Sequence, residues 1–211
     1  MNRAYAAIAL VLAAAPSWAG GPIAIPAQVP FALGVEVSDA AKAECDLQSF
    51  QSDQLKSALG AAGFEVTQKE GLTEAAPGKV LLLEFSHGES TGRALDIFSP
   101  RTNFLLINGC LYDNGKVTAT FMDTRYSTGG FGGEFKKTCA ILHKIETVMA
   151  GDIAKWAASN PPIFALLGNG AGTKVELPPN TPPFCMMSDK LTPEMKAQWR
   201  QQRQQQQQQA K

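Results

Sequence analysis

The sequence predicts an α+β fold, a two-layer sandwich in which two long helices cover one face of a sheet of four to five mainly antiparallel strands. Apolar residues recur at helical spacing in residues 46–62 and again in residues 138–158. Between these two segments, short apolar runs of strand length alternate with turn residues. Asn114-Gly115 lies between two such runs and suits a hairpin turn with two positive φ angles. Helices that flank strands in this order bury their apolar faces best on one side of the sheet.

The chain begins with a segment that is typical of a secretory signal peptide. Residues 1–19 combine Arg3, an apolar stretch and the small residues Ser17 and Ala19 before Gly20. The apolar stretch of about a dozen residues is shorter than the roughly 20 residues that span a bilayer. No cysteine follows it closely, which disfavours a lipid anchor. We therefore expect a periplasmic or secreted protein with no transmembrane anchor.

The first part of the mature chain is expected to lead into a single domain. Residues 20–30 contain three prolines and predict an extended lead-in rather than a regular element. The domain is predicted at residues 31–160, with a first strand at residues 31–37. The first long helix, residues 46–62, ends before Gly63, which suits the C-terminus of a helix.

The middle of the chain is expected to supply the rest of the sheet. Strands are predicted at residues 64–67, 80–85, 104–112 and 116–126. The last two would form a hairpin around the Asn-Gly turn, with Cys110 opposite Ala119. Apolar and polar residues alternate along the second arm, so we expect one buried and one wet face.

The second long helix and the tail complete the predicted organisation. The helix at residues 138–158 is followed by Asn160-Pro161-Pro162, which is expected to end the domain. Residues 161–190 then predict a Pro/Gly-rich linker. Residues 191–211 predict a Gln-rich polar helix or a disordered tail.

Charge and short motifs argue against several classes of function. The chain has 19 basic and 19 acidic residues, and this balance excludes the basic footprint of a nucleic-acid-binding protein. Residues 129–138 are rich in glycine and lysine but lack the spacing of a phosphate-binding loop. Two histidines without a paired spacing do not make a metal site. We therefore predict no cofactor and no metal.

Residues 88–92, GESTG, match the G-x-S-x-G nucleophile motif of serine hydrolases. That motif requires a helix directly after the serine, whereas the following residues end in Ser99-Pro100. The later histidine, His143, falls within a predicted helix. We interpret the stretch as a polar turn between strands and keep catalysis by Ser90 as the weaker alternative.

Four cysteines in an exported chain favour disulfides over free thiols. Cys45 and Cys139 stand at the starts of the two long helices, so helices that pack side by side would bring them together. We predict this disulfide. Cys110 and Cys185 could form a second pair that holds the tail to the domain. The alternative, a buried thiol at Cys110 and a free thiol at Cys185, stays open.

The segment between the last predicted strand and the second helix offers a candidate contact surface. Arg125, Tyr126 and Phe131 would be exposed there beside several glycines. Binding residues are often carried by loops that a rigid scaffold positions. We regard the segment mainly as a flexible connection, with weak anion or peptide contact as the alternative.

Several short tracts taken together resemble a group of small exported bacterial proteins of unknown function. The tracts are Glu44-Cys45-Asp46-Leu47, Asn114-Gly115-Lys116-Val117, Thr124-Arg125, Ser127, Gly129-Gly130, Gly132-Gly133, Thr138-Cys139, Ile141-Leu142, Asp152-Ile153 and Trp156. The resemblance covers roughly residues 31–157 and implies no activity, cofactor or site. The order of elements is also similar to that of envelope-assembly accessory domains, which is a likeness of architecture alone.

The sequence thus favours a non-enzymatic protein-binding or envelope accessory module, with another envelope protein as the expected partner. A serine hydrolase that uses Ser90 is the alternative. A carrier of a small apolar ligand is disfavoured, because the two helices would use the whole apolar face of the sheet.

Overall fold

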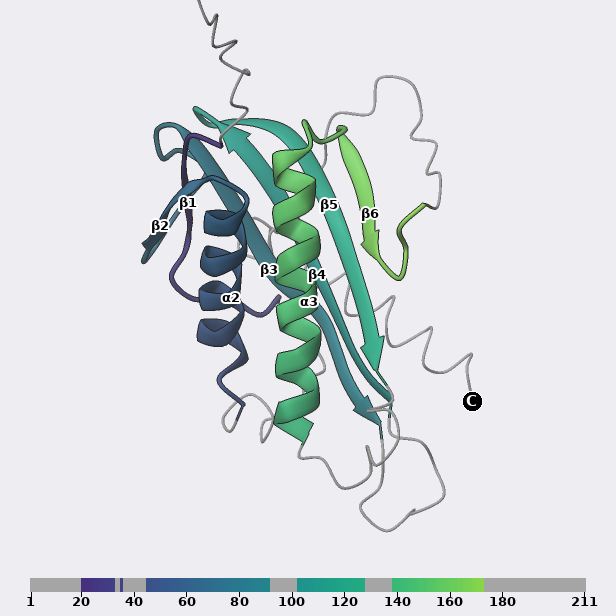
Figure 1. Cartoon of the computed structure of the whole chain (residues 1–211). Coiled ribbons are helices and arrows are strands. Elements are labelled where there is room, and N and C mark those ends of the chain that lie inside the picture. Colours follow the sequence, from purple (N-terminus) through teal and green to yellow (C-terminus); the bar gives the residue numbers. More distant parts are fainter. Residues whose placement is uncertain (1–19, 33–34, 36–44, 92–101, 128–137, 173–211) are drawn as a thin grey trace, which may run out of the picture.

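A mixed sheet of six strands forms one layer of the protein, and two helices form the other (Figure 1). This architecture is taken from a computed structural model, which describes residues 20–32, 35, 45–91, 102–127 and 138–172. The strands are β1 (Pro22–Pro26), β2 (Glu65–Lys69), β3 (Lys79–Thr91), β4 (Thr102–Asp113), β5 (Lys116–Ser127) and β6 (Phe164–Gly168). The helices are α2 (Leu47–Ala61) and α3 (Thr138–Ala158).

The strand order is β2-β1-β3-β4-β5-β6. β3, β4 and β5 are antiparallel, whereas β1 is parallel to both β2 and β3, and β5 is parallel to β6. The predicted α+β class is therefore confirmed. The predicted strand number was too low, and the sheet is mixed rather than mainly antiparallel.

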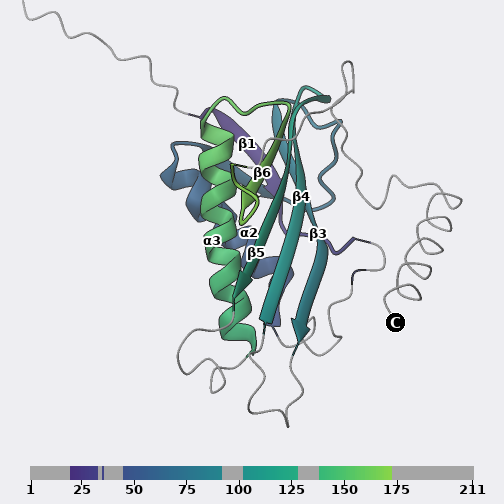
Figure 2. The same ribbon diagram turned by 90° about the vertical axis from the view of Figure 1, so that its right-hand side faces the viewer.

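Both helices lie on the same face of the sheet, as Figures 1 and 2 show from two sides. Leu55 and Leu59 of α2 and Met149 and Ile153 of α3 are fully buried against it. Burial of one such side chain stabilises the fold by about 1.5–3 kcal/mol. The core between helices and sheet is therefore the main source of stability.

The N-terminal edge of the sheet differs from the prediction. Residues 20–30, expected as a lead-in, contain β1, and the strand predicted at residues 31–37 is reduced to one bridge between Phe31 and Phe85. Prolines occupy the two ends of β1, where a missing N–H group costs little. The three residues between them are buried and supply the pairing.

The predicted hairpin between β4 and β5 is present, but its register is shifted by one residue. The turn has positive φ at Asn114 and Gly115, as expected. An irregularity next to the turn leaves Thr118 without an opposite residue, so Cys110 pairs with Thr120 rather than Ala119. A β-bulge of this kind moves every later pair by one position.

The C-terminal edge of the sheet also differs from the prediction. β6 lies within residues 161–190, which were expected to form a linker, and it extends the domain beyond residue 160. An apolar run between Pro162 and Gly168 explains the pairing. Residues 1–19, predicted as a signal peptide, and the tail at residues 191–211 lie outside the described residues.

Candidate functional site

The free side of β6 is the main candidate for a binding site. β6 pairs with β5 on one side and with no described residue on the other. The Ile163 carbonyl accepts a hydrogen bond from the Thr120 N–H at 2.9 Å, and the Asn169 N–H donates to the Thr124 carbonyl at 2.8 Å. In a parallel ladder, residues face the partner strand alternately. The N–H and C=O groups of the even-numbered β6 residues therefore point away from β5, and we call this side the β6 edge.

The side chains of β6 are apolar on both faces of the sheet. Ala165 and Leu167 pack against the helix-covered core. Phe164 and Leu166 alternate with them and are partly exposed. No residue of β6 carries a charge. The β6 edge therefore combines main-chain hydrogen-bonding groups with an apolar strand.

Three large apolar side chains of the described residues are exposed, namely Tyr126 (58 % exposed), Ile163 (55 %) and Val148 (41 %). Ile163 directly precedes β6. The Tyr126 N–H donates to Asn169 Oδ1 at 3.2 Å, just beyond the other end of the strand. Val148 lies one helical turn before Asp152, which is bonded to β5. We call β6 together with Ile163 and Tyr126, which lie near its two ends, the β6 surface.

A buried carboxyl group lies under the end of β6. Asp123 on β5 is fully buried, and burial, followed by the charge of Asp152, raises its pKa to about 7, although Arg125 acts in the opposite direction. Arg125 Nε donates to Asp152 Oδ2 at 2.9 Å, and the second guanidinium nitrogen donates to the same atom. A Cβ atom at Gly168 would lie only 2.3 Å from Asp123 Oδ1. Glycine is therefore required where β6 ends.

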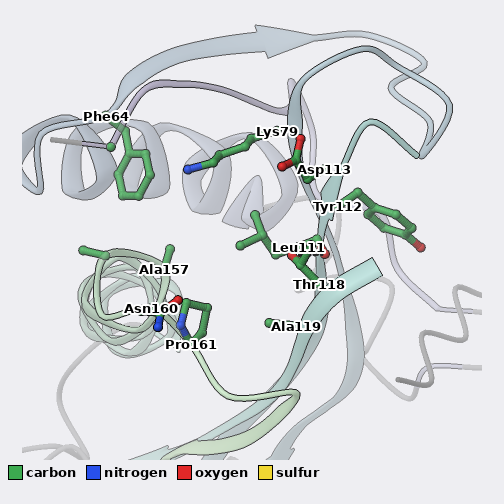
Figure 3. Close-up of a pocket in the computed structure, with 12 residues that line it drawn as sticks. Phe64, Lys79, Leu111, Tyr112, Asp113, Thr118, Ala119, Ala157, Asn160 and Pro161 are labelled. Atoms are coloured by element: carbon green, nitrogen blue, oxygen red, sulfur yellow. Dashed lines mark hydrogen bonds between the residues drawn. The ribbon is translucent and has the colours of Figure 1, made fainter. Parts of the chain in front are cut away.

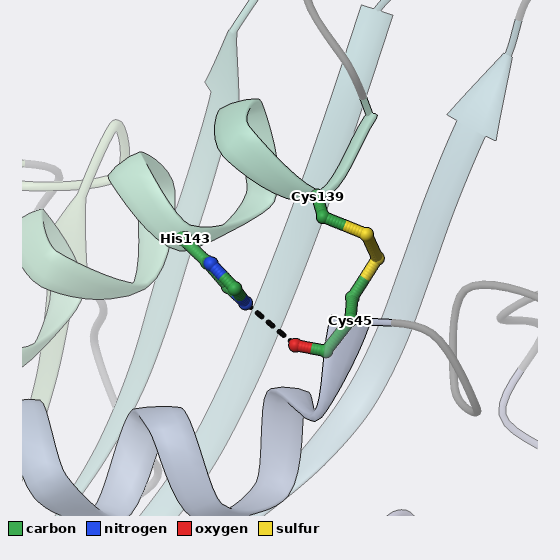
Figure 4. Close-up of a disulfide and its surroundings, with 3 residues drawn as sticks. All are labelled: Cys45, Cys139 and His143. Atoms are coloured by element: carbon green, nitrogen blue, oxygen red, sulfur yellow. Dashed lines mark hydrogen bonds between the residues drawn. A yellow bond between two sulfur atoms is a disulfide. The ribbon is translucent and has the colours of Figure 1, made fainter.

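The predicted disulfide between Cys45 and Cys139 is confirmed, with a Cα–Cα distance of 5.0 Å (Figure 4). It joins the starts of the two helices. His143 Nε2 is 2.5 Å from the Cys45 carbonyl oxygen, and its ring stacks on Phe50 with centroids 3.9 Å apart. His143 thus supports the junction of the helices.

Two polar residues in the helix layer were not singled out from the sequence. Gln51 of α2 and Glu146 of α3 are fully buried. Burial, followed by the charge of Asp46, raises the pKa of Glu146 to about 9, so this carboxyl group is neutral at ordinary pH. Its position between Leu142 and Met149, inside the apolar face of the helix, was the signal that could have revealed it.

Ser90 lies in an extended strand and not in the turn that was expected at residues 88–92. β3 continues to Thr91, and Ser90 pairs with Asn103 of β4. The nucleophile motif instead places its serine on a sharp turn between strand and helix. The main chain at Ser90 therefore does not have the conformation that the hydrolase alternative needs.

The remaining predicted site residues lie in different places. Cys110 is buried on β4, while its predicted partner Cys185 lies outside the described residues, so this pairing stays a prediction. Among the candidate contact residues, Tyr126 is exposed and Arg125 is bonded to Asp152. Phe131 lies outside the described residues.

A cavity of about 320 Å³ opens where the β4–β5 hairpin meets the end of α3 (Figure 3). Phe64, Leu111 and Pro161 supply apolar walls. Its charged lining residues are Lys79, which extends toward Phe64, and Asp113. Both are exposed, so the cavity provides neither a buried charge nor a paired nucleophile and base.

The described part of the chain offers neither a metal-ligand cluster nor a membrane-spanning helix. It contains no group of three or more His, Cys, Asp or Glu side chains placed to hold a metal ion. Neither of its two helices is long and apolar enough to cross a membrane.

Comparison with known proteins gives only distant likenesses. No protein-family model and no curated protein sequence matches the chain. A minor lipoprotein from Acinetobacter baumannii is 13 % identical with a TM-score of 0.39, over 68 % of this chain and 94 % of that one. PelC from Paraburkholderia phytofirmans, a dodecamer, is 10 % identical with a TM-score of 0.38, over 64 % and 89 %. A Xanthomonas campestris protein of the family model DUF330 is 13 % identical with a TM-score of 0.39, over 69 % and 89 %. Likenesses this weak do not identify a function, which has to be argued from the geometry of this chain.

Proposed function

We propose that this protein is an exported, non-enzymatic module that binds another envelope protein through the β6 surface. The observation that carries the proposal is an uncharged edge strand with exposed apolar side chains near both ends, Ile163 and Tyr126. Large exposed apolar side chains that gather in one region are typical of protein interaction sites. A partner that covered them would remove apolar area from water, and this would stabilise the complex.

Export is supported by two independent features of the chain. Residues 1–19 have the composition of a signal peptide. The disulfide between Cys45 and Cys139 requires an oxidising compartment to persist. The periplasm or the medium outside the cell meets this requirement.

Binding is favoured over catalysis by the environment of the titratable groups. Among the residues that the structure describes, Asp123 and Glu146 have carboxyl groups with raised pKa values, and both are fully buried, so a substrate cannot reach them. A fluorophosphonate probe tests the hydrolase alternative directly. Labelling of the parent protein that is lost in Ser90→Ala would establish catalysis and overturn the proposal, whereas we expect no labelling of either protein.

Site-specific crosslinking in living cells tests the binding surface. We would place a photoreactive amino acid at Ile163 in the full chain and at Lys69, an exposed residue on the opposite edge of the sheet, as the control. We expect Ile163 to capture one defined envelope protein, which should then bind the purified chain, and Lys69 not to capture it. Equal capture from both positions, or no capture at Ile163, would contradict the proposal.

A further inference from the structure

We infer that the partner adds an extended segment to the β6 edge as a seventh strand, held mainly by main-chain hydrogen bonds. This inference rests on the proposed function and specifies how the β6 surface would bind. The outward groups are the N–H and C=O of Phe164 and Leu166 and the N–H of Gly168, three donors and two acceptors, since the odd-numbered residues face β5. Such groups are a template for another strand.

The edge lacks the features with which isolated edge strands avoid pairing. Proteins usually protect an edge with charged side chains, an internal proline or a bulge. β6 has the sequence FALLG, and its register with β5 is continuous over all five residues. An uncharged strand with a continuous register can accept an added strand, because no charge, internal proline or bulge opposes the pairing.

The end of β6 limits the length of the added segment. After Leu167 the chain turns, because the Gly170 N–H donates to the Leu167 carbonyl at 3.1 Å and the Ala171 N–H donates to the Gly168 carbonyl at 3.2 Å. The Gly168 carbonyl is thus already bonded. The pairing segment therefore spans about the length of β6, with Ile163 and Tyr126 near its two ends.

The size of the edge favours an extended segment over a second folded copy of this chain. Stable interfaces between folded proteins bury about 1,200–2,000 Å². Pairing two strands of five residues provides only a small part of that area. A flexible segment needs no such area from other elements, because it can lie along the strand and reach the exposed apolar side chains at both ends. We expect it to carry apolar side chains at alternate positions, next to Phe164 and Leu166.

Replacement of Leu166 by proline tests the pairing. Proline removes the outward N–H of this residue and places its ring at the free edge, while the bonds to β5 come from the neighbouring residues. We expect Leu166→Pro to reduce crosslinking from Ile163 and the affinity for the captured protein by about tenfold, since one main-chain hydrogen bond is lost and the ring obstructs the added strand. The matched control Leu166→Val keeps the N–H and should bind within about twofold of the parent.

Hydrogen exchange provides a second measurement that does not depend on the stability of the variant. In the parent chain, the captured partner should slow exchange of the Phe164 and Leu166 amides, whereas the Ala165 amide is already protected by β5. If both outward amides are protected without the partner, another part of the chain or a second copy covers the edge, and the inference is wrong. If Leu166→Pro still crosslinks from Ile163, strand addition is wrong while the proposed function stands. A parent chain that captures nothing at Ile163 instead contradicts the proposed function itself.

Discussion

The two edge strands of the sheet, β2 and β6, have the same length and pairing direction but different side chains. β2 and β6 each have five residues, and each pairs in parallel with its single neighbour among the described residues. β2 exposes Glu65 and Lys69, whereas β6 carries no charge and is flanked by exposed Ile163. Charged side chains oppose pairing with another strand. The two edges therefore differ in their side chains rather than in strand length or direction, and the proposed binding at β6 depends on this difference.

The two edges are also attached to the helix layer in different ways. Gln68 of β2 donates hydrogen bonds of 2.9 Å to Ser52 and Asp53 of α2. β6 instead contacts the core through Ala165 and Leu167. The β2 edge is thus held by polar bonds to its helix in addition to the packing of Val66 on the core, whereas the β6 edge is held by apolar packing and by the turn after the strand.

Loss of the disulfide should lower the stability of the protein more than the other changes, because this bond joins α2, the helix beside β2, to α3, the helix nearer β6. Cys139→Ser should lower the free energy of unfolding by about 4–5 kcal/mol in the chain-entropy model, since the bond closes a loop between residues 94 positions apart. Denaturant unfolding without reductant measures this change, and both edges should become less protected from hydrogen exchange. An unchanged unfolding free energy would remove the structural role of this bond.

Replacement of Gly168 by alanine should disrupt β6 and leave β2 unaffected. Its φ is +65°, and a Cβ atom would lie 2.3 Å from the Thr124 carbonyl oxygen, so we expect a loss of about 2–4 kcal/mol. Gly71, two residues after β2, is the matched control because its φ is +58° and nothing lies within 4 Å of a Cβ there. Gly71→Ala should cost only the backbone strain, about 1–2 kcal/mol. Denaturant unfolding measures both changes. If Gly168→Ala and Gly71→Ala lower the free energy of unfolding equally, the backbone at Gly168 is not packed closely against β5.

The pH dependence of stability should also distinguish the two edges, since Asp123 lies beneath β6. Its pKa of about 7 in the folded protein exceeds its ordinary value of 3.8, so the folded state keeps a proton that the unfolded chain releases. This contribution is fully present below about pH 4, falls as the pH rises, and is lost above about pH 7, with a slope of at most about 1.4 kcal/mol per pH unit.

Asp123→Asn should therefore flatten the decline in unfolding free energy between about pH 4 and pH 7. Glu146→Gln is the comparison in the helix layer, because the pKa of Glu146 is raised from 4.5 to about 9 and this variant should flatten the decline from about pH 4.5 to about pH 9. Above about pH 7, only Glu146→Gln should therefore alter the curve. Denaturant titrations at several pH values measure both changes. An unaltered curve for Asp123→Asn would show that the buried carboxyl group does not bind a proton in this range.

The parts of the fold that were predicted correctly depend on local periodicity. The helix predicted at residues 138–158 has the same bounds as α3, and its first turn supplies Cys139 to the predicted disulfide. β1 and β6 were missed because each is short and pairs in parallel with a strand distant in the sequence. A local pattern contains no information about such a partner.

The candidate site could be predicted only in part. Alternate residues of β5 lie on the same face of the sheet. On the face that carries the apolar residues Ala119 and Phe121, the next two positions are Asp123 and Arg125. This change from apolar to charged residues could have predicted that Asp123 is buried. That β6 is an edge could not be predicted, since it depends on the strand order. Tyr126 was named as a contact residue from its place beside a loop, whereas its position near the end of β6 required the structure.

The smallest change in stability should come from making the β2 edge resemble the β6 edge. The double replacement Glu65→Thr and Lys69→Val removes exposed charges and should alter the unfolding free energy by less than about 0.5 kcal/mol. It should nevertheless produce association that increases with protein concentration, because an uncharged edge accepts another strand. Sedimentation velocity measures this association.

Lys56→Val with Glu70→Thr is the control, since both residues are exposed and lie outside the strand. If the β2 variant sediments like the parent chain and the control, charge does not distinguish the two edges, and the affinity of β6 for a partner must come from the exposed side chains at its ends.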